Sequence, residues 1–175
     1  VYERDYVEAT RQGKPSENVW AQDDRIITSV DFAKQDDMRA ALENLDEEWD
    51  IAVFDEAHHL TARRRGDTVD RTDRYRVGEA VAENSDGLLF LTGTPHKGKP
   101  DQFYYMISLI DPYRFRSEGD ITPDALQDLM VRRLKENMYE ADGTPMFPEK
   151  NIETLGVEFT PEERALYEDV TAYIR

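Results

Sequence analysis

Three short runs of apolar residues, each ending at polar residues, are the clearest feature of the hydrophobic pattern. They lie within residues 25–30, 51–54 and 87–91. Runs of this length without regular alternation are typical of strands that are buried on both faces of a parallel sheet. We therefore expect three buried strands.

Three longer stretches have apolar residues at helical spacing, and we expect each to form a helix. They are residues 31–46, 74–84 and 100–110. A strand, a helix and a second strand in succession form a right-handed crossover unit by default. The pattern therefore predicts an α/β fold, in which helices flank a parallel sheet.

The last part of the chain is expected to be an extension of helices and one strand. Thr122 and Pro123 are a cap and a first-turn proline for a helix through Lys135, and 151–159 has the composition of a strand. Thr160 begins a capping box for a final helix. We expect two parts, which are residues 1–117 and 118–175.

The charge balance is strongly acidic, with 38 acidic and 22 basic residues among 175 and a formal net charge of -16. Charged residues make up 34% of the chain, against about 25% in an average domain. An acidic surface with only six lysines resembles the proteins of salt-loving archaea. The absence of cysteine favours a reducing cytoplasm, and no apolar run is long enough to span a membrane.

Two adjacent carboxylates, Asp55 and Glu56, follow the apolar run 51–54 directly. Ligands of open α/β sheets bind outside the carboxyl ends of the strands, which is where this pair is expected. One carboxylate there can hold magnesium while the other polarises a water molecule. His58 and His59 lie close by, so a metal-dependent hydrolase that uses all four side chains is an alternative.

Two motifs resemble those of the superfamily-two helicases. Residues 55–58 read Asp-Glu-Ala-His, like the second helicase motif, and residues 91–95 read Leu-Thr-Gly-Thr-Pro, like the third. Residues 27–34 and the Arg-Arg-Leu-Lys sequence at 132–135 resemble segments of Swi/Snf-type ATPases, most closely the RapA-like branch. The chain therefore looks like the second half of a first RecA-like lobe, with motif two at 55–58 and motif three at 91–95.

The resemblance implies a role for each motif residue. Asp55 would hold the magnesium that accompanies ATP, Glu56 would orient the attacking water, and His58 would couple to motif three. Thr92 and Thr94 would exchange hydrogen bonds during that coupling. Gly93 stands where many helicases have alanine, and we expect it to let another backbone come close.

Nucleic acid, and double-stranded DNA in particular, is the partner that the resemblance implies. The expected contacts are Thr28, Ser29, Lys97, Lys99, Arg132 and Arg133. For Thr28 and Ser29, capping of the next helix is an equally good interpretation. A further protein partner, either RNA polymerase or a defence complex, stays open.

The sequence contains no loop that could hold the phosphates of ATP. Lys14 is followed by Pro15 and Lys99 by Pro100, where such a loop needs Ser or Thr. The start at Val1 and the final helix that runs to the last residue suggest an excised fragment. We expect the isolated chain to be inactive, and a protein-interaction module that has lost catalysis is a second alternative.

Overall fold

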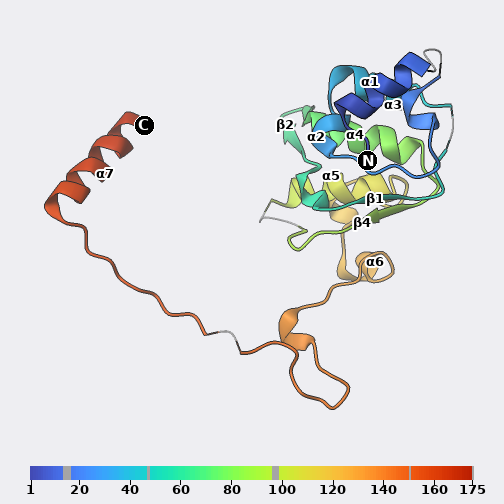
Figure 1. The fold of residues 1–175 in the computed structure, drawn as a ribbon. Helices are drawn as coiled ribbons and strands as arrows, with labels where there is room; N and C mark the ends of the chain where they lie inside the picture. Colours follow the sequence, from blue (N-terminus) through green and yellow to red (C-terminus); the bar gives the residue numbers. More distant parts are fainter. Residues whose placement is uncertain (14–16, 47, 96–98, 150, 175) are drawn as a thin grey trace. The chain divides into compact units, whose positions relative to one another are not determined.

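A computed structural model describes residues 1–13, 17–46, 48–95, 99–149 and 151–174 (Figure 1). It divides into two compact units, Val1–Met130 and Val131–Arg175. Ile121, Leu126 and Met130 pack against the core of the first unit, so this unit extends beyond the boundary expected at residue 117. No helix in the described part of the chain is both long and apolar enough to cross a membrane.

Two of the three expected strands pair in parallel. Strand β1 (Ala52–Phe54) lies beside β4 (Leu88–Phe90), with Val53 opposite Leu89. The backbone N–H of Leu91 donates to the carbonyl of Phe54 at 2.9 Å, which continues the pairing past the strand ends. The two carboxyl ends therefore lie side by side, as the crossover pattern predicted.

The expectation of a third buried strand at residues 25–30 is wrong. Only Thr28 forms a bridge, to Tyr2, and the Ile27 side chain is 71% exposed. The reason is local, because the Ser29 hydroxyl caps helix α2 (Val30–Ala33) by accepting from the N–H of Phe32. The helix begins inside the apolar run and takes its last residue.

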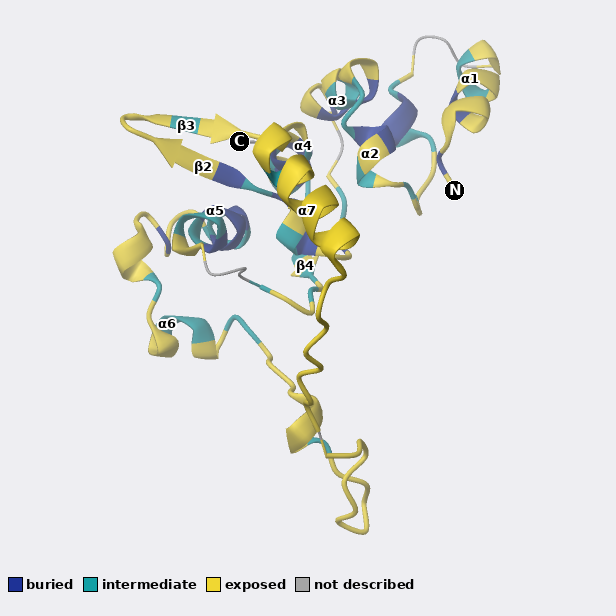
Figure 2. Cartoon of the chain, turned by 90° about the vertical axis from the view of Figure 1, so that its left-hand side faces the viewer, coloured by how far each residue is buried: buried dark blue, intermediate teal, exposed yellow. Residues whose placement is uncertain are grey.

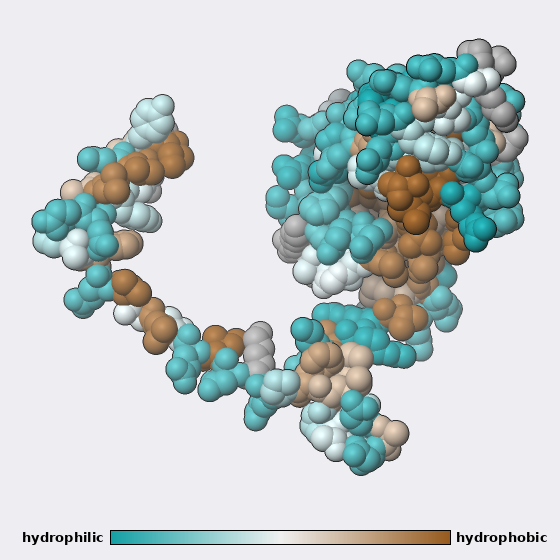
Figure 3. Space-filling model, in the orientation of Figure 1, coloured by the Kyte–Doolittle hydropathy of each residue, from teal (hydrophilic) through white to brown (hydrophobic). Residues whose placement is uncertain are grey.

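One face of the β1–β4 pair is exposed, although the sequence predicted burial on both faces. Ile51 and Val53 are 61% and 54% exposed, and Leu89 and Leu91 are each 45% exposed. Figure 3 shows the resulting apolar surface on the first unit. The opposite face is covered, and there the ring of Phe54 meets that of Phe90 edge-on at 5.5 Å.

The three helices expected at 31–46, 74–84 and 100–110 follow the predicted apolar spacing, with one break. The helix expected over 31–46 is split, because Gln35 has an extended backbone between α2 and α3 (Asp36–Glu43). Helix α4 (Asp73–Glu83) forms where its apolar spacing predicted, and the structure adds a cap at Thr72. Helix α5 (Pro100–Ile110) begins with its proline, as predicted. The buried side chains include Met38, Leu42, Leu60, Tyr75, Val77, Phe103 and Phe115.

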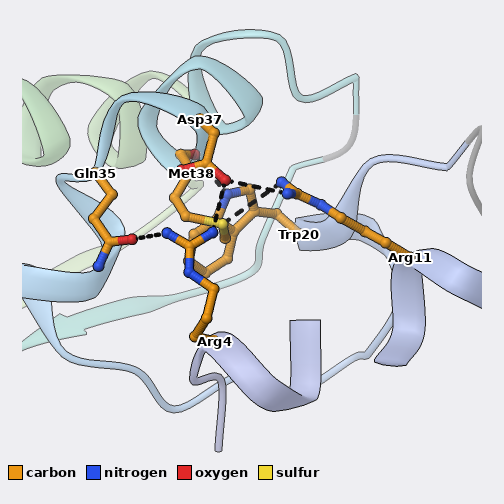
Figure 4. A network of polar contacts seen from close by, with 6 residues as sticks. All are labelled: Arg4, Arg11, Trp20, Gln35, Asp37 and Met38. Carbon is orange, nitrogen blue, oxygen red and sulfur yellow. Dashed lines mark hydrogen bonds and ion pairs between the residues drawn. The ribbon is translucent and has the colours of Figure 1, made fainter. Parts of the chain in front are cut away.

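Polar contacts fix the first helix, α1 (Arg4–Gly13), against α3 (Figure 4). The guanidinium groups of Arg4 and Arg11 each lie 3.1 Å from Oδ2 of Asp37. The indole N–H of Trp20, in the short 3-10 helix η1 (Val19–Ala21), donates to the carbonyl of Met38 at 2.9 Å. One carboxylate thus binds two cations from the neighbouring helix.

Residues 62–71 form a hairpin that the hydrophobic pattern does not indicate. Strands β2 (Ala62–Arg65) and β3 (Thr68–Arg71) are antiparallel, and Gly66 adopts a positive φ of 61° at the turn (Figure 2). The sequence of β2 does not show the apolar–polar alternation of a strand, because three of its residues are consecutive arginines.

The segments beyond α5 depart most from prediction. Helix α6 (Pro123–Gln127) has the expected Thr122 cap but ends before Arg132, so the helix predicted to Lys135 is wrong. In the second unit, short 3-10 helix η4 (Lys135–Asn137) precedes residues 151–159, which are extended but pair with no described strand. Helix α7 (Pro161–Ile174) begins at the predicted capping box.

Candidate functional site

The acidic pair lies in a tight turn at the carboxyl end of β1. Glu56 has a left-handed backbone (φ 49°, ψ 43°), which non-glycine residues rarely adopt. Oδ1 of Asp55 accepts from the N–H of Glu56 at 2.9 Å, and the N–H of Ala57 donates to the carbonyl of Leu91 at 3.0 Å. Such strain persists only where its surroundings fix it, and it is concentrated at functional sites.

His58 joins this turn to the segment after β4. It lies on the 3-10 helix η2 (Ala57–His59), and its side chain is 11% exposed. Its Nδ1 lies 2.9 Å from Oγ1 of Thr92 and 3.1 Å from Oε2 of Glu56. Because a carboxylate can only accept, a proton on Nδ1 satisfies both contacts. The tips of two adjacent strands are therefore linked through one imidazole.

The third motif is connected to His58 through the Thr92 hydroxyl. Oγ1 of Thr92 also accepts from the N–H of Thr94 at 3.1 Å. A Cβ added at Gly93 would meet no atom within 4 Å, so the close backbone approach expected there is not present among the described residues. The structure thus brings together Glu56, His58, Thr92 and Thr94.

A cavity of about 280 Å³ lies beside the acidic pair. Its lining includes Phe54, Asp55, Glu56, His59 and Arg74. Magnesium binds through one or two carboxylate oxygens and otherwise keeps water and phosphate ligands. The carboxylate of Asp55 suits this use, since it is exposed and the turn fixes one of its oxygens.

The metal-hydrolase alternative finds no support in the geometry. Among the residues that the structure describes, no three His, Cys, Asp or Glu side chains are grouped so as to hold a metal ion. The rings of His58 and His59 instead lie against each other, with centroids 4.2 Å apart.

The expected nucleic-acid contacts belong to different segments of the chain. The Thr28 hydroxyl donates to the carbonyl of Tyr2 at 3.0 Å, and the Ser29 hydroxyl caps α2, so the capping interpretation holds for Ser29. Lys97 lies outside the described residues, and Lys99 lines a separate cavity. Arg132 and Arg133 belong to the second unit, where both are exposed and neither is helical.

Arg74 is a site residue that the sequence analysis missed. Its guanidinium binds both carboxylate oxygens of Asp31, at 2.8 and 2.9 Å, next to the acidic pair. Hydrogen bonds from Lys34 and Arg74 hold the pKa of Asp31 below its usual value. The available signal was weak, because Arg74 stands in the first turn of a helix and has no motif around it.

The chain is similar to segments of much longer curated proteins, all described as RNA polymerase-associated protein RapA. It is 31% identical to that of Vibrio atlanticus over 150 residues, which are 80% of this chain and 15% of that protein. It is 29% identical to that of Cronobacter sakazakii over 177 residues, covering 90% of this chain and 17% of that protein.

A shorter match, to RapA of Erwinia tasmaniensis, has 40% identity over 101 residues, or 57% of this chain and 10% of that protein. No protein-family model matches the chain. The chain thus spans less than a fifth of the length of these relatives. The similarity fits the Swi/Snf-type ATPases that residues 27–34 and 132–135 resemble.

Proposed function

We propose that the chain is part of an ATP-driven nucleic-acid motor of the Swi/Snf type, a remodelling ATPase that moves along double-stranded DNA. The observation that carries this proposal is the link between two strand tips: Glu56, after β1, and Thr92, after β4, both contact Nδ1 of His58. The similarity to RapA proteins supports the same assignment.

In this proposal each carboxylate has one task. Asp55 would hold magnesium, whose charge would neutralise the phosphate oxygens of ATP. Glu56 would orient the water that attacks the γ-phosphate. The left-handed turn fixes the backbone of Glu56, and its carboxylate contacts Nδ1 of His58 at 3.1 Å.

His58 would pass the state of the nucleotide to the third motif. A change in the charge or position of Glu56 alters the partner of Nδ1, and Thr92 is the other group bound to that nitrogen. Thr94 would follow, because its backbone N–H donates to the Thr92 hydroxyl. A small set of hydrogen bonds with two arrangements is a recognised way to couple hydrolysis to movement.

RNA polymerase is the protein partner that we propose for the longer protein to which this segment belongs. The proposal follows from the relatives, which are named as RNA polymerase-associated. Co-purification of the longer protein with RNA polymerase tests it, and a defence complex in its place would contradict it.

The assignment of Glu56 is tested in the longer protein by Glu56→Gln. We expect ATP binding to be retained and DNA-stimulated hydrolysis to be lost, because an amide cannot polarise the water as a carboxylate does. Glu8→Gln, an exposed change on α1 with the same loss of charge, is the control and should leave turnover intact. Turnover above a few per cent in Glu56→Gln would show that another group orients the water.

The 175-residue chain alone is expected not to bind ATP tightly, because no phosphate-cradling loop occurs in its sequence. Isothermal titration with ATP and magnesium measures this directly, and a micromolar dissociation constant would contradict it. An intact Gly-x-Gly-Lys-Thr motif elsewhere in the longer protein separates a motor from a module that has lost catalysis.

A further inference from the structure

A second, larger cavity of the first unit has a charge opposite to that of the chain. It measures about 460 Å³, within the usual range of ligand pockets. Its lining carries four permanent cations, Lys34, Arg63, Arg74 and Lys99, and one carboxylate, Asp73. The whole chain has 38 acidic and 22 basic residues, so this is a local reversal of its charge.

Some of these charges are already neutralised by their neighbours. Lys34 and Arg74 share the carboxylate of Asp31, each at 2.8 Å. The carboxylate of Asp73 lies 3.8 Å from Arg76, on the same helix. Arg63 and Lys99 therefore account for most of the excess positive charge.

The register of the hairpin explains why Arg63 is available. Asp70 stands directly opposite Arg63, but its carboxylate pairs with Arg65 at 3.4 Å. The side chain between them, Arg64, points to the other face of the strand, where its interaction with the Tyr105 hydroxyl raises the pKa of the guanidinium. Neither Arg63 nor Lys99 has an acidic partner within the described residues.

The polar groups of the lining suit an anion with several oxygen atoms. Arg63 offers a planar set of donors that matches two oxygens of one phosphate, and Lys99 offers a point charge. The Gln102 amide and the His59 ring supply further N–H groups on the same lining.

We propose that this cavity is a binding site for a phosphate group, held chiefly by Arg63 and Lys99. The phosphate would be either a free phosphate ion or part of a nucleic-acid backbone, since both present the same oxygens. Binding at this site does not need the acidic pair, ATP or magnesium, so the proposal is independent of the proposed motor activity.

The test uses the 175-residue chain with inorganic phosphate, diphosphate and a short single-stranded oligonucleotide, at constant ionic strength. Amide NMR shifts follow binding. We expect saturable binding of phosphate or diphosphate, about tenfold weaker in Arg63→Gln and in Lys99→Gln, because each variant removes one charge-assisted hydrogen bond. Arg25→Gln removes the same charge at an exposed position of the first unit, outside the cavity lining and in no ion pair with a described residue, and should leave the affinity within about twofold.

The oligonucleotide identifies the source of the phosphate. Displacement of inorganic phosphate by the oligonucleotide, with the same loss in Arg63→Gln, supports a site for the nucleic-acid backbone. Phosphate binding that the oligonucleotide does not disturb supports a site for the free ion. The proposal is overturned if neither phosphate nor diphosphate saturates, or if Arg25→Gln weakens binding as much as Arg63→Gln, because the attraction would then be general.

Discussion

Tyr75 connects the two helices that border the basic cavity, and its ionisation gives a quantitative test of the packing. Its side chain is 4% exposed on α4, and its hydroxyl donates to the carbonyl of Tyr105, on α5, at 3.2 Å. Burial raises the pKa of Tyr75 from 10.0 to about 12. Removal of the hydroxyl in Tyr75→Phe tests both the hydrogen bond and the raised pKa.

The magnitude follows from two opposing contributions. At pH 7 the variant loses one neutral hydrogen bond, and the carbonyl of Tyr105 keeps a second donor, the Ser108 hydroxyl at 2.9 Å. We therefore expect a loss of about 0.5–1 kcal/mol in the free energy of unfolding.

At high pH the sign changes. The folded state favours the neutral phenol, so the associated stability is complete below pH ~10 and is lost as the pH rises through ~12. For a shift of about two units, linkage predicts that the wild type has lost about 1.4 kcal/mol at pH ~11. Tyr75→Phe lacks this group, so it should become the more stable protein near that pH.

Urea unfolding of both proteins between neutral and alkaline pH measures the crossover. Other tyrosines contribute equally to both proteins and cancel in the difference. Tyr113→Phe, at a position that is 82% exposed, is the control and should give a curve parallel to the wild type. If the Tyr75→Phe and wild-type curves stay parallel up to pH ~11, the phenol is not held neutral by burial, and the packing described here is wrong.

Three further predictions concern the stability of the protein. Asp37→Asn removes the carboxylate that lies 3.1 Å from two arginines of α1, and should cost about 1 kcal/mol at pH 7 by urea unfolding. Partial burial raises the pKa of Asp37, but the hydrogen bonds from these arginines outweigh burial, so the net shift of this pKa is downward. The stability advantage of the wild type over Asp37→Asn should therefore disappear below pH ~4. Equal urea midpoints of the two proteins at pH 7 would contradict the prediction. Gly78→Ala places a Cβ 3.0 Å from Cδ1 of Leu109 and 3.3 Å from Cδ1 of Leu60. Overpacking should exceed the gain in helix propensity and lower the free energy of unfolding by about 1 kcal/mol. A higher melting temperature would show that the two leucine side chains move to accommodate the methyl group. The melting temperature of the chain, whose net charge is -16, should rise with potassium chloride up to about 1 M, where the Debye length is ~3 Å, and a flat response would refute self-repulsion as a major cost.

The sequence predicted the parts of the fold in which local and tertiary preferences agree. Helices α4 and α5 have apolar residues at helical spacing together with a cap or a first-turn proline, and both form where expected. The run at 25–30 failed because Ser29 offers the backbone a helix cap, which competes with strand pairing. A helix was predicted to reach Lys135 because apolar residues continue at helical spacing beyond Gln127, but α6 ends at Gln127.

The candidate site was predictable in its composition but only partly in its geometry. The ends of β1 and β4 lie together because parallel strands share an edge, and His58 lies 2.9 Å from Thr92 there. The left-handed turn at Glu56 and the ion pair between Asp31 and Arg74 could not be read from the pattern. Both depend on contacts between segments that no local periodicity records.

The open face of the β1–β4 pair has a consequence for handling the protein. Ile51, Val53, Leu89 and Leu91 offer an apolar surface beside two short parallel strands, a combination that favours association between copies. Electrolyte that relieves carboxylate repulsion also removes the barrier that keeps such surfaces apart, and strongly hydrated anions such as sulfate strengthen apolar contact further. Colloidal stability should therefore pass through an optimum as the salt concentration rises. Potassium chloride should keep the protein dispersed over a wider range of salt concentrations than potassium sulfate.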